Sequence, residues 1–86
     1  MKTIKEFHVQ PSDDAFSFTA PLGGEVVSVR PDVNKLNELV VHLLVDDSEP
    51  TMTYNMRIFQ ADSEVRGRYV ASYRGYDLKF RHVFIF

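Results

Sequence analysis

The segment Met52-Thr-Tyr-Asn-Met-Arg-Ile58 decides the fold class, because its apolar residues recur at every second position. A period of two is the signature of a β-strand with one face on a core and the other in solvent. Similar strand-like segments recur along the chain at a spacing of roughly ten residues. They predict seven strands, at residues 5–9, 16–19, 25–30, 38–45, 52–58, 69–74 and 78–86. We therefore expect one domain over residues 1–86 that is all-β, a small antiparallel sandwich or a barrel-like fold.

One stretch also fits a helix. Apolar residues recur at helical spacing between residues 33 and 44, and Asp32 could cap a helix that begins there. The adjacent β-branched residues Val40 and Val41 favour a strand instead. We expect a strand there, with a helical turn at residues 32–37 as the limited alternative and a full helix as the competing one.

The composition excludes several classes of protein. The chain has no cysteine, which excludes disulfides, thiolate nucleophiles and Cys-ligated metal sites. The N-terminal segment lacks the apolar run of a signal peptide, and no segment approaches the roughly 18 apolar residues of a membrane span. We expect a cytoplasmic protein with no membrane partner.

Charge is distributed unevenly along the chain. Residues 1–50 carry four basic and nine acidic side chains, and residues 51–86 carry six basic and three acidic ones. Five of the six basic residues in the second part are arginine, which suits planar, bidentate contacts. If strands from the two parts alternate in space, the asymmetry cancels; if they do not, the fold has a basic and an acidic side.

No catalytic or metal-binding pattern is visible. His8, His42 and His82 fall on three different expected strands, without the spacing that fixes metal-ligand geometry. The clustered carboxylates at 46–49 lack the alternating ligands of a calcium loop and are better read as turn residues. No nucleophile elbow or phosphate-binding glycine loop occurs. We expect a non-enzymatic protein with no cofactor and no metal.

The segment from Arg66 to Tyr76 is the first candidate binding surface, since it interleaves arginine with tyrosine. The side chains of Arg66, Arg68, Arg74 and Tyr76 could hold phosphates or stack on bases, and the same residue types form interface hot spots. Strand parity offers an alternative: Tyr69 and Tyr73 share one face, on the core, while Arg68 and Arg74 share the solvated face.

The chain ends in the apolar run Val83, Phe84, Ile85 and Phe86, the second candidate surface. Such a strand is either central in its sheet or covered by something else. An intramolecular core strand is one explanation. The other is a homo-oligomer interface, formed by strand pairing or by sheet stacking.

Six segments support a resemblance that spans nearly the whole chain: Ile4-Lys-Glu-Phe7, Ala20-Pro-Leu-Gly-Gly-Glu-Val-Val-Ser-Val29, Leu39 to Asp46, Arg57-Ile-Phe59, Tyr69-Val-Ala-Ser-Tyr73 and His82-Val-Phe84. In them the chain resembles a family of small, uncharacterised bacteriophage proteins. Members often have Trp in the fourth strand and before the terminal His, where this chain has Val41 or His42, and Arg81. They often have Thr-Gly after the fifth strand, where this chain has Gln60-Ala61. The resemblance implies a phage or prophage source, and hence a host-cell cytoplasm, and a small β-rich fold; it implies no activity.

Three functions follow as expectations. The first is a phage accessory protein that binds a host protein, for example as an inhibitor of a host defence system. The second is a module that binds nucleotides or nucleic acid through the Arg66–Tyr76 segment. The third is a small structural or self-assembling phage protein.

Overall fold

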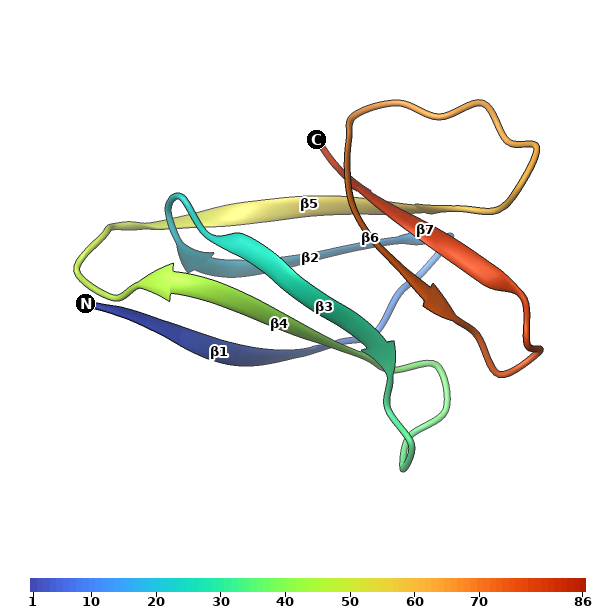
Figure 1. Ribbon diagram of the computed structural model, residues 1–86, viewed down its shortest axis with the longest axis horizontal. Coiled ribbons are helices and arrows are strands. Elements are labelled where there is room, and N and C mark those ends of the chain that lie inside the picture. Colours follow the sequence, from blue (N-terminus) through green and yellow to red (C-terminus); the bar gives the residue numbers. More distant parts are fainter.

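The computed structural model describes residues 1–86 and confirms the all-β class, since seven strands form two antiparallel sheets packed face to face (Figure 1). The strands are β1 (Lys2–Val9), β2 (Ala15–Pro21), β3 (Glu25–Pro31), β4 (Leu39–Asp46), β5 (Thr51–Phe59), β6 (Arg68–Arg74) and β7 (Phe80–Ile85). The three-stranded sheet has the order β1-β4-β3 and the four-stranded sheet the order β2-β5-β7-β6. The fold is therefore a small sandwich. Strand β4 occupies the second part of the stretch that competed for helix, and residues 33–37 form bends and a turn, not a helical turn.

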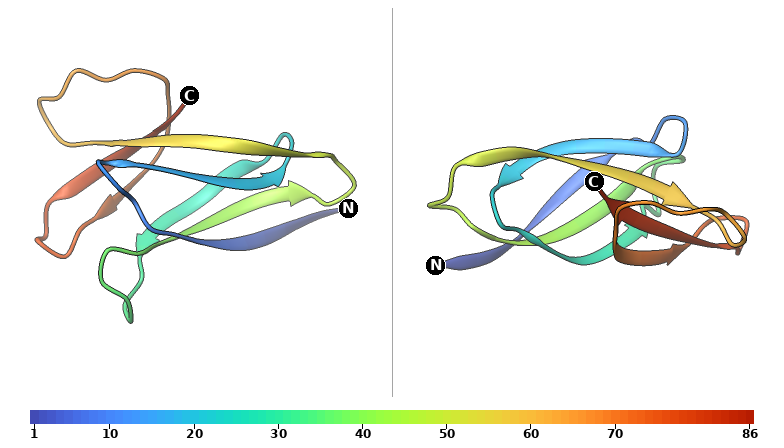
Figure 2. Two further views of the ribbon diagram at one scale, coloured as in Figure 1. Left: turned by 180° about the vertical axis from the view of Figure 1, so that it is seen from behind. Right: turned by 90° about the horizontal axis from the view of Figure 1, so that it is seen from above.

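The chain passes from one sheet to the other three times. It crosses after β1, after β2 and after β4, and then adds β6 and β7 beside β5 in the four-stranded sheet. Seen from above, the two layers are distinct, with β1, β3 and β4 under β2 and β5 (Figure 2). Because of this order, the three-stranded sheet is built only from residues before position 47.

The core lies between the sheets and follows the alternation in the sequence. Val41, Leu43 and Val45 of β4 are fully buried against the four-stranded sheet. On the facing strands, the rings of Phe18 and Tyr54 stack at 5.3 Å between centroids, and Phe7 of the other sheet stacks on Phe18 at 5.0 Å. These aromatic contacts join the two sheets directly.

The most apolar strands are central ones, as expected from their composition. Strand β4 lies between β1 and β3, and β7 lies between β5 and β6. Both sides of β7 are therefore occupied by backbone hydrogen bonds. Oligomerisation by strand pairing through β7, one form of the predicted interface, is not possible in this fold.

A β-bulge in β6 overturns the parity prediction for Tyr69 and Tyr73. The register shifts between Tyr69 and Ala71, so that Val70 is an extra residue without a partner on β7. An extra residue reverses which face the following side chains occupy. Tyr73 is buried, whereas Tyr69 is 54% exposed on the opposite face. The two tyrosines do not share a face.

The turn from β1 to β2 gives a testable prediction. Ser12 and Ala15 exchange two backbone hydrogen bonds around Asp13 and Asp14, and both aspartates have positive φ, as in a type I′ turn. This conformation costs a residue with a Cβ about 1–2 kcal/mol. We expect Asp14→Gly to raise the free energy of unfolding by about 0.5–1 kcal/mol, measured by urea denaturation.

The matched control is Glu49→Gly, in a turn where φ is not positive. It should lower the free energy of unfolding slightly, because glycine there adds only flexibility to the unfolded chain. If both variants lowered the free energy of unfolding, the positive φ of Asp14 would not be a source of strain.

The structure contains no helix of the length and apolar character needed to cross a membrane.

Candidate functional site

The sandwich separates the charges of the chain between its two sheets. The only strand from the first 50 residues in the four-stranded sheet is β2, and it carries no charged residue. All six basic residues after position 50 belong to the four-stranded sheet and its loops. Apart from the uncharged β2, the strands of the two parts do not mix, so the asymmetry in the sequence becomes a more basic and a more acidic side of the molecule.

The outer face of the four-stranded sheet carries five aromatic rings. Tyr69, Phe80 and Phe86 are each more than half exposed, and Phe59 and Phe84 are half-buried. Phe84 is the centre of the group, with edge-to-face contacts to Phe59 at 5.4 Å and to Tyr69 at 5.7 Å between ring centroids. Soluble proteins rarely leave so many large apolar side chains together on one surface unless it binds something.

Arginines accompany these rings. The guanidinium of Arg57 lies 5.7 Å from the centre of the Phe86 ring, and that of Arg74 lies 5.3 Å from the centre of the Phe80 ring. Both distances suit cation–π attraction. We call the five rings together with Arg57, Arg66 and Arg74 the aromatic–arginine face.

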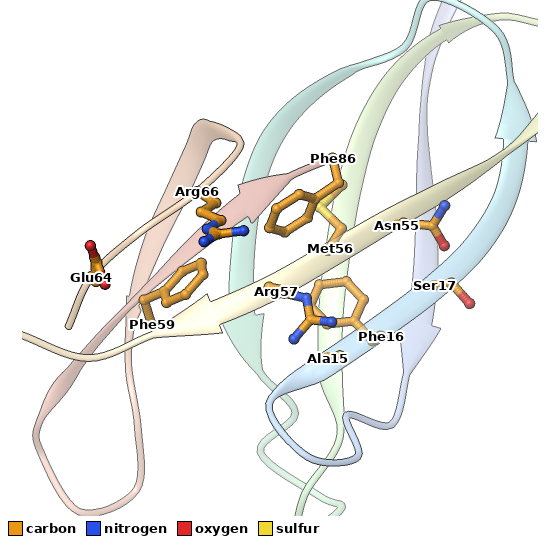
Figure 3. A pocket seen from close by; sticks show the side chains of 10 residues that line it. All are labelled: Ala15, Phe16, Ser17, Asn55, Met56, Arg57, Phe59, Glu64, Arg66 and Phe86. Carbon is orange, nitrogen blue, oxygen red and sulfur yellow. The ribbon is translucent and has the colours of Figure 1, made fainter.

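A pocket lies on this face at the end of the chain (Figure 3). Its polar rim includes Asn55 and Arg57 of β5, with Glu64 and Arg66 from the loop between β5 and β6. Figure 3 shows Phe59 and Phe86 beside Arg66. The pocket therefore offers apolar surface, two guanidiniums and one carboxylate to a partner.

Polar contacts fix the rest of the face. The hydroxyls of Tyr69 and Ser72 hydrogen-bond at 2.8 Å, and Ser72 Oγ lies 2.7 Å from His82 Nδ1. At the tip of the β6–β7 hairpin, Arg81 makes a bidentate pair with Asp77, with both N–O distances 2.9 Å. This pairing, helped by the Lys79 backbone N–H, holds the pKa of the Asp77 carboxyl well below its ordinary value. The hairpin that carries Phe80 is thereby stiffened.

The structure divides the four residues predicted as a binding surface. Arg66 and Arg74 lie on the aromatic–arginine face. Arg68 precedes the bulge and points the other way, into a pocket with Gly24 and Tyr54. The Tyr76 hydroxyl donates to the backbone oxygen of Asp32 in the other sheet. These four side chains do not form one cluster.

The alternation along β7 places the four C-terminal residues on two opposite faces of the sheet. Val83 is fully buried and Ile85 packs on the core, so neither is available to a partner. Phe84 and Phe86 lie on the aromatic–arginine face.

Sequence reasoning missed Arg57, Phe59 and Phe80 as members of this face. Arg57 and Phe59 continue the polar side of the alternation that begins at Met52, whereas Phe80 shares the aromatic side of the last strand with Phe84 and Phe86. Their proximity depends on the strand order β5-β7-β6, which no local pattern encodes.

A separate polar cluster lies on the outer face of the three-stranded sheet. His8 Nε2 is 2.7 Å from Glu6 Oε1, and His42 Nε2 is 3.4 Å from Glu6 Oε2. His8 Nδ1 faces Glu38 Oε1 at 3.1 Å and Asp32 Oδ2 at 3.5 Å. Glu6 and Glu38 raise the pKa of His8 above its ordinary value, Glu6 contributing most. The sequence predicted no metal site, yet His8, Asp32 and Glu38 are the residues here that could hold an ion.

No protein-family model, curated protein or solved structure matches this chain. The resemblance to small phage proteins therefore stays a prediction.

Proposed function

We propose that this chain is a non-enzymatic binding protein and that the aromatic–arginine face docks on a partner protein. The observation that carries the proposal is the grouping of five aromatic rings and three arginines on one sheet face. Aromatic and arginine side chains are the types most enriched at interface hot spots. In line with the resemblance, we propose a phage source and a protein of the bacterial host as the partner, an inhibitory role being one form of this function.

The arrangement of the rings favours a protein over bases as the occupant. A base stacks on an open ring face. Here Phe84 is flanked by Phe59 and Tyr69, and guanidiniums of Arg57 and Arg74 lie over Phe86 and Phe80. The rings therefore already pack against one another or against a guanidinium, and together they form a preorganised surface. A partner that complements it presents apolar side chains together with carboxylates.

Nucleic-acid binding is the second candidate, and the basic character of the four-stranded sheet favours it. Arg57 and Arg66 line the pocket with a single acidic residue, Glu64, and Arg74 lies on the same face. Phosphate contacts would make such binding fall steeply with salt concentration. A salt titration therefore separates the two candidates.

The test is affinity capture from bacterial lysate with tagged wild-type protein and with Phe86→Ser as the surface variant. Phe86 is 53% exposed, so the variant should remain folded. We expect one stoichiometric host protein on the wild type, and at least a 30-fold weaker affinity for the variant, as for a hot-spot residue worth about 2 kcal/mol. Binding constants should be measured with the purified partner.

The control variant is Ile4→Ser, which removes a residue 60% exposed on the other sheet. It should bind as the wild type does. Equal losses in Ile4→Ser and Phe86→Ser, or captured nucleic acid with no protein, would refute the proposal. In the latter case a steep salt dependence would establish the second candidate.

A further inference from the structure

We propose that His8, Asp32 and Glu38 bind a divalent transition-metal ion, of which zinc is the best match to the ligands. This site lies on the three-stranded sheet and does not depend on the proposed function of the other sheet. One imidazole nitrogen and two carboxylate oxygens are donors that zinc accepts. Their ligand atoms all lie within 4.8 Å of one another.

The distances suit a single ion. Zinc is about 2.0–2.2 Å from nitrogen and oxygen ligands, so two ligands of a tetrahedral ion lie about 3.3–3.5 Å apart. His8 Nδ1 is 3.1 Å from Glu38 Oε1 and 3.5 Å from Asp32 Oδ2. Small side-chain shifts would admit the ion, with a water molecule as the fourth ligand.

The backbone brings the three ligands together on rigid elements. His8 lies on β1 opposite Val40, near the beginning of β4. Asp32 and Glu38 flank the β3–β4 loop, and the backbone N–H of Asp32 donates to the Glu38 carbonyl at 2.9 Å. One ligand thus lies on a strand, and the other two lie directly next to strand ends, where the hydrogen bond between Asp32 and Glu38 closes the loop.

His8 and Asp32 are each held by a further contact away from the ion. The other ring nitrogen of His8, Nε2, is 2.7 Å from Glu6 Oε1, and Glu6 in turn contacts His42. Asp32 Oδ1 accepts the backbone N–H of Asn34 at 2.8 Å, which leaves Oδ2 facing His8. A carboxylate on the distal nitrogen of a ligating histidine is the usual second contact in zinc sites.

The carboxylates of the cluster are only partly neutralised: Lys35 Nζ lies 4.0 Å from Glu38 Oε2, but Asp32 Oδ2 and Glu38 Oε1 have no cation other than His8 beside them. The Asp32 side chain is 13% exposed, and the only polar group beside its Oδ2 is His8 Nδ1, at 3.5 Å. That oxygen and Glu38 Oε1 both face His8 Nδ1, which carries at most one proton. A cation between the three groups would replace that proton and satisfy both carboxylates.

The test is isothermal titration of the full chain with Zn²⁺ in a non-chelating buffer, at a pH high enough that His8, whose pKa is raised, is neutral. We expect one zinc ion per chain. His8→Gln and Asp32→Asn should abolish the binding. Glu6→Gln, which changes only the residue that positions His8, should weaken it about 10–100-fold. Co²⁺ in place of zinc should give the visible absorption of a tetrahedral site in the wild type but not in His8→Gln or Asp32→Asn.

His82→Gln is the matched control, because His82 lies on the other sheet beside Ser72. It should bind zinc with wild-type affinity, and circular dichroism should show that every variant is folded. The proposal is overturned if the wild type binds no zinc at millimolar concentration. It is also overturned if His8→Gln retains wild-type affinity, or if His82→Gln loses as much as His8→Gln does.

Discussion

Val83→Asp should unfold the protein at neutral pH. Val83 is fully buried in the middle of β7, one of the two central strands of the four-stranded sheet, and no cation lies among the residues of the core around it. An unpaired carboxylate in such a place costs several kcal/mol. A domain of this size has a free energy of unfolding near the lower end of about 5–15 kcal/mol. The loss of the β-sheet circular dichroism signal at 25 °C would be the readout.

The matched control is Phe86→Asp. Phe86 directly follows β7 and lies on the outer face of the same sheet, beside Arg57. Phe86 is 53% exposed, so its carboxylate would stay in water and the protein should remain folded. The contrast between the two variants tests the alternation along β7, and therefore which residues can reach a partner. If Val83→Asp remained folded, β7 would not be a core strand, and the aromatic–arginine face would lose its central ring.

The alternation that distinguishes these two positions is also what the sequence predicts best. A period of two, or a run of apolar and β-branched residues, locates all seven strands, and continuous apolar runs mark β4 and β7, two of the three central strands. These features are local, since each depends on residues within a single strand. For the same reason, the alternation in the sequence divides the aromatic side chains of each strand between two faces, one toward the core and one toward solvent.

The features that the sequence did not predict share one physical cause: each depends on how the strands pair in the sheets. The bulge at Val70 reverses the faces of Tyr69 and Tyr73, and it arises from the register of β6 on β7. The candidate metal site joins His8 to Asp32 and Glu38 across the strand order β1-β4-β3. Neither can be derived from spacing along the chain, because register is set by contacts between strands.

The arrangement of the sheets also explains why the two candidate sites are separate. The aromatic–arginine face uses residues after position 56, and the His8 cluster uses residues before position 43. Since the chain builds one sheet almost wholly from each part, the two outer faces can change independently. What couples them is the core and the few contacts that link one sheet to the other.

Tyr54→Phe should break one of those links and lower the free energy of unfolding by about 2 kcal/mol. Tyr54 of β5 is 3% exposed, and its hydroxyl accepts the backbone N–H of Gly24 at 2.8 Å and donates to the carbonyl of Pro21. Both partners belong to the turn that carries the chain from the four-stranded sheet to β3. Phenylalanine would leave these two backbone groups without a partner in a place that water reaches poorly.

The turn is shaped to fit that hydroxyl. A Cβ on Gly24 would lie 2.9 Å from the Tyr54 oxygen and 2.8 Å from Leu43 Cδ2, so only glycine allows the ring to come this close. Tyr73→Phe is the matched control, because Tyr73 is similarly buried but its hydroxyl makes no hydrogen bond within the protein. It should change stability by less than about 0.5 kcal/mol. Thermal unfolding gives the readout, since each kcal/mol corresponds to about 4–8 °C in a domain of this size. Equal shifts for the two variants would assign the loss to the ring environment and not to the turn. A large shift for Tyr54→Phe alone would show that one hydroxyl fixes the crossing between the sheets, and with it the separation of the two outer faces.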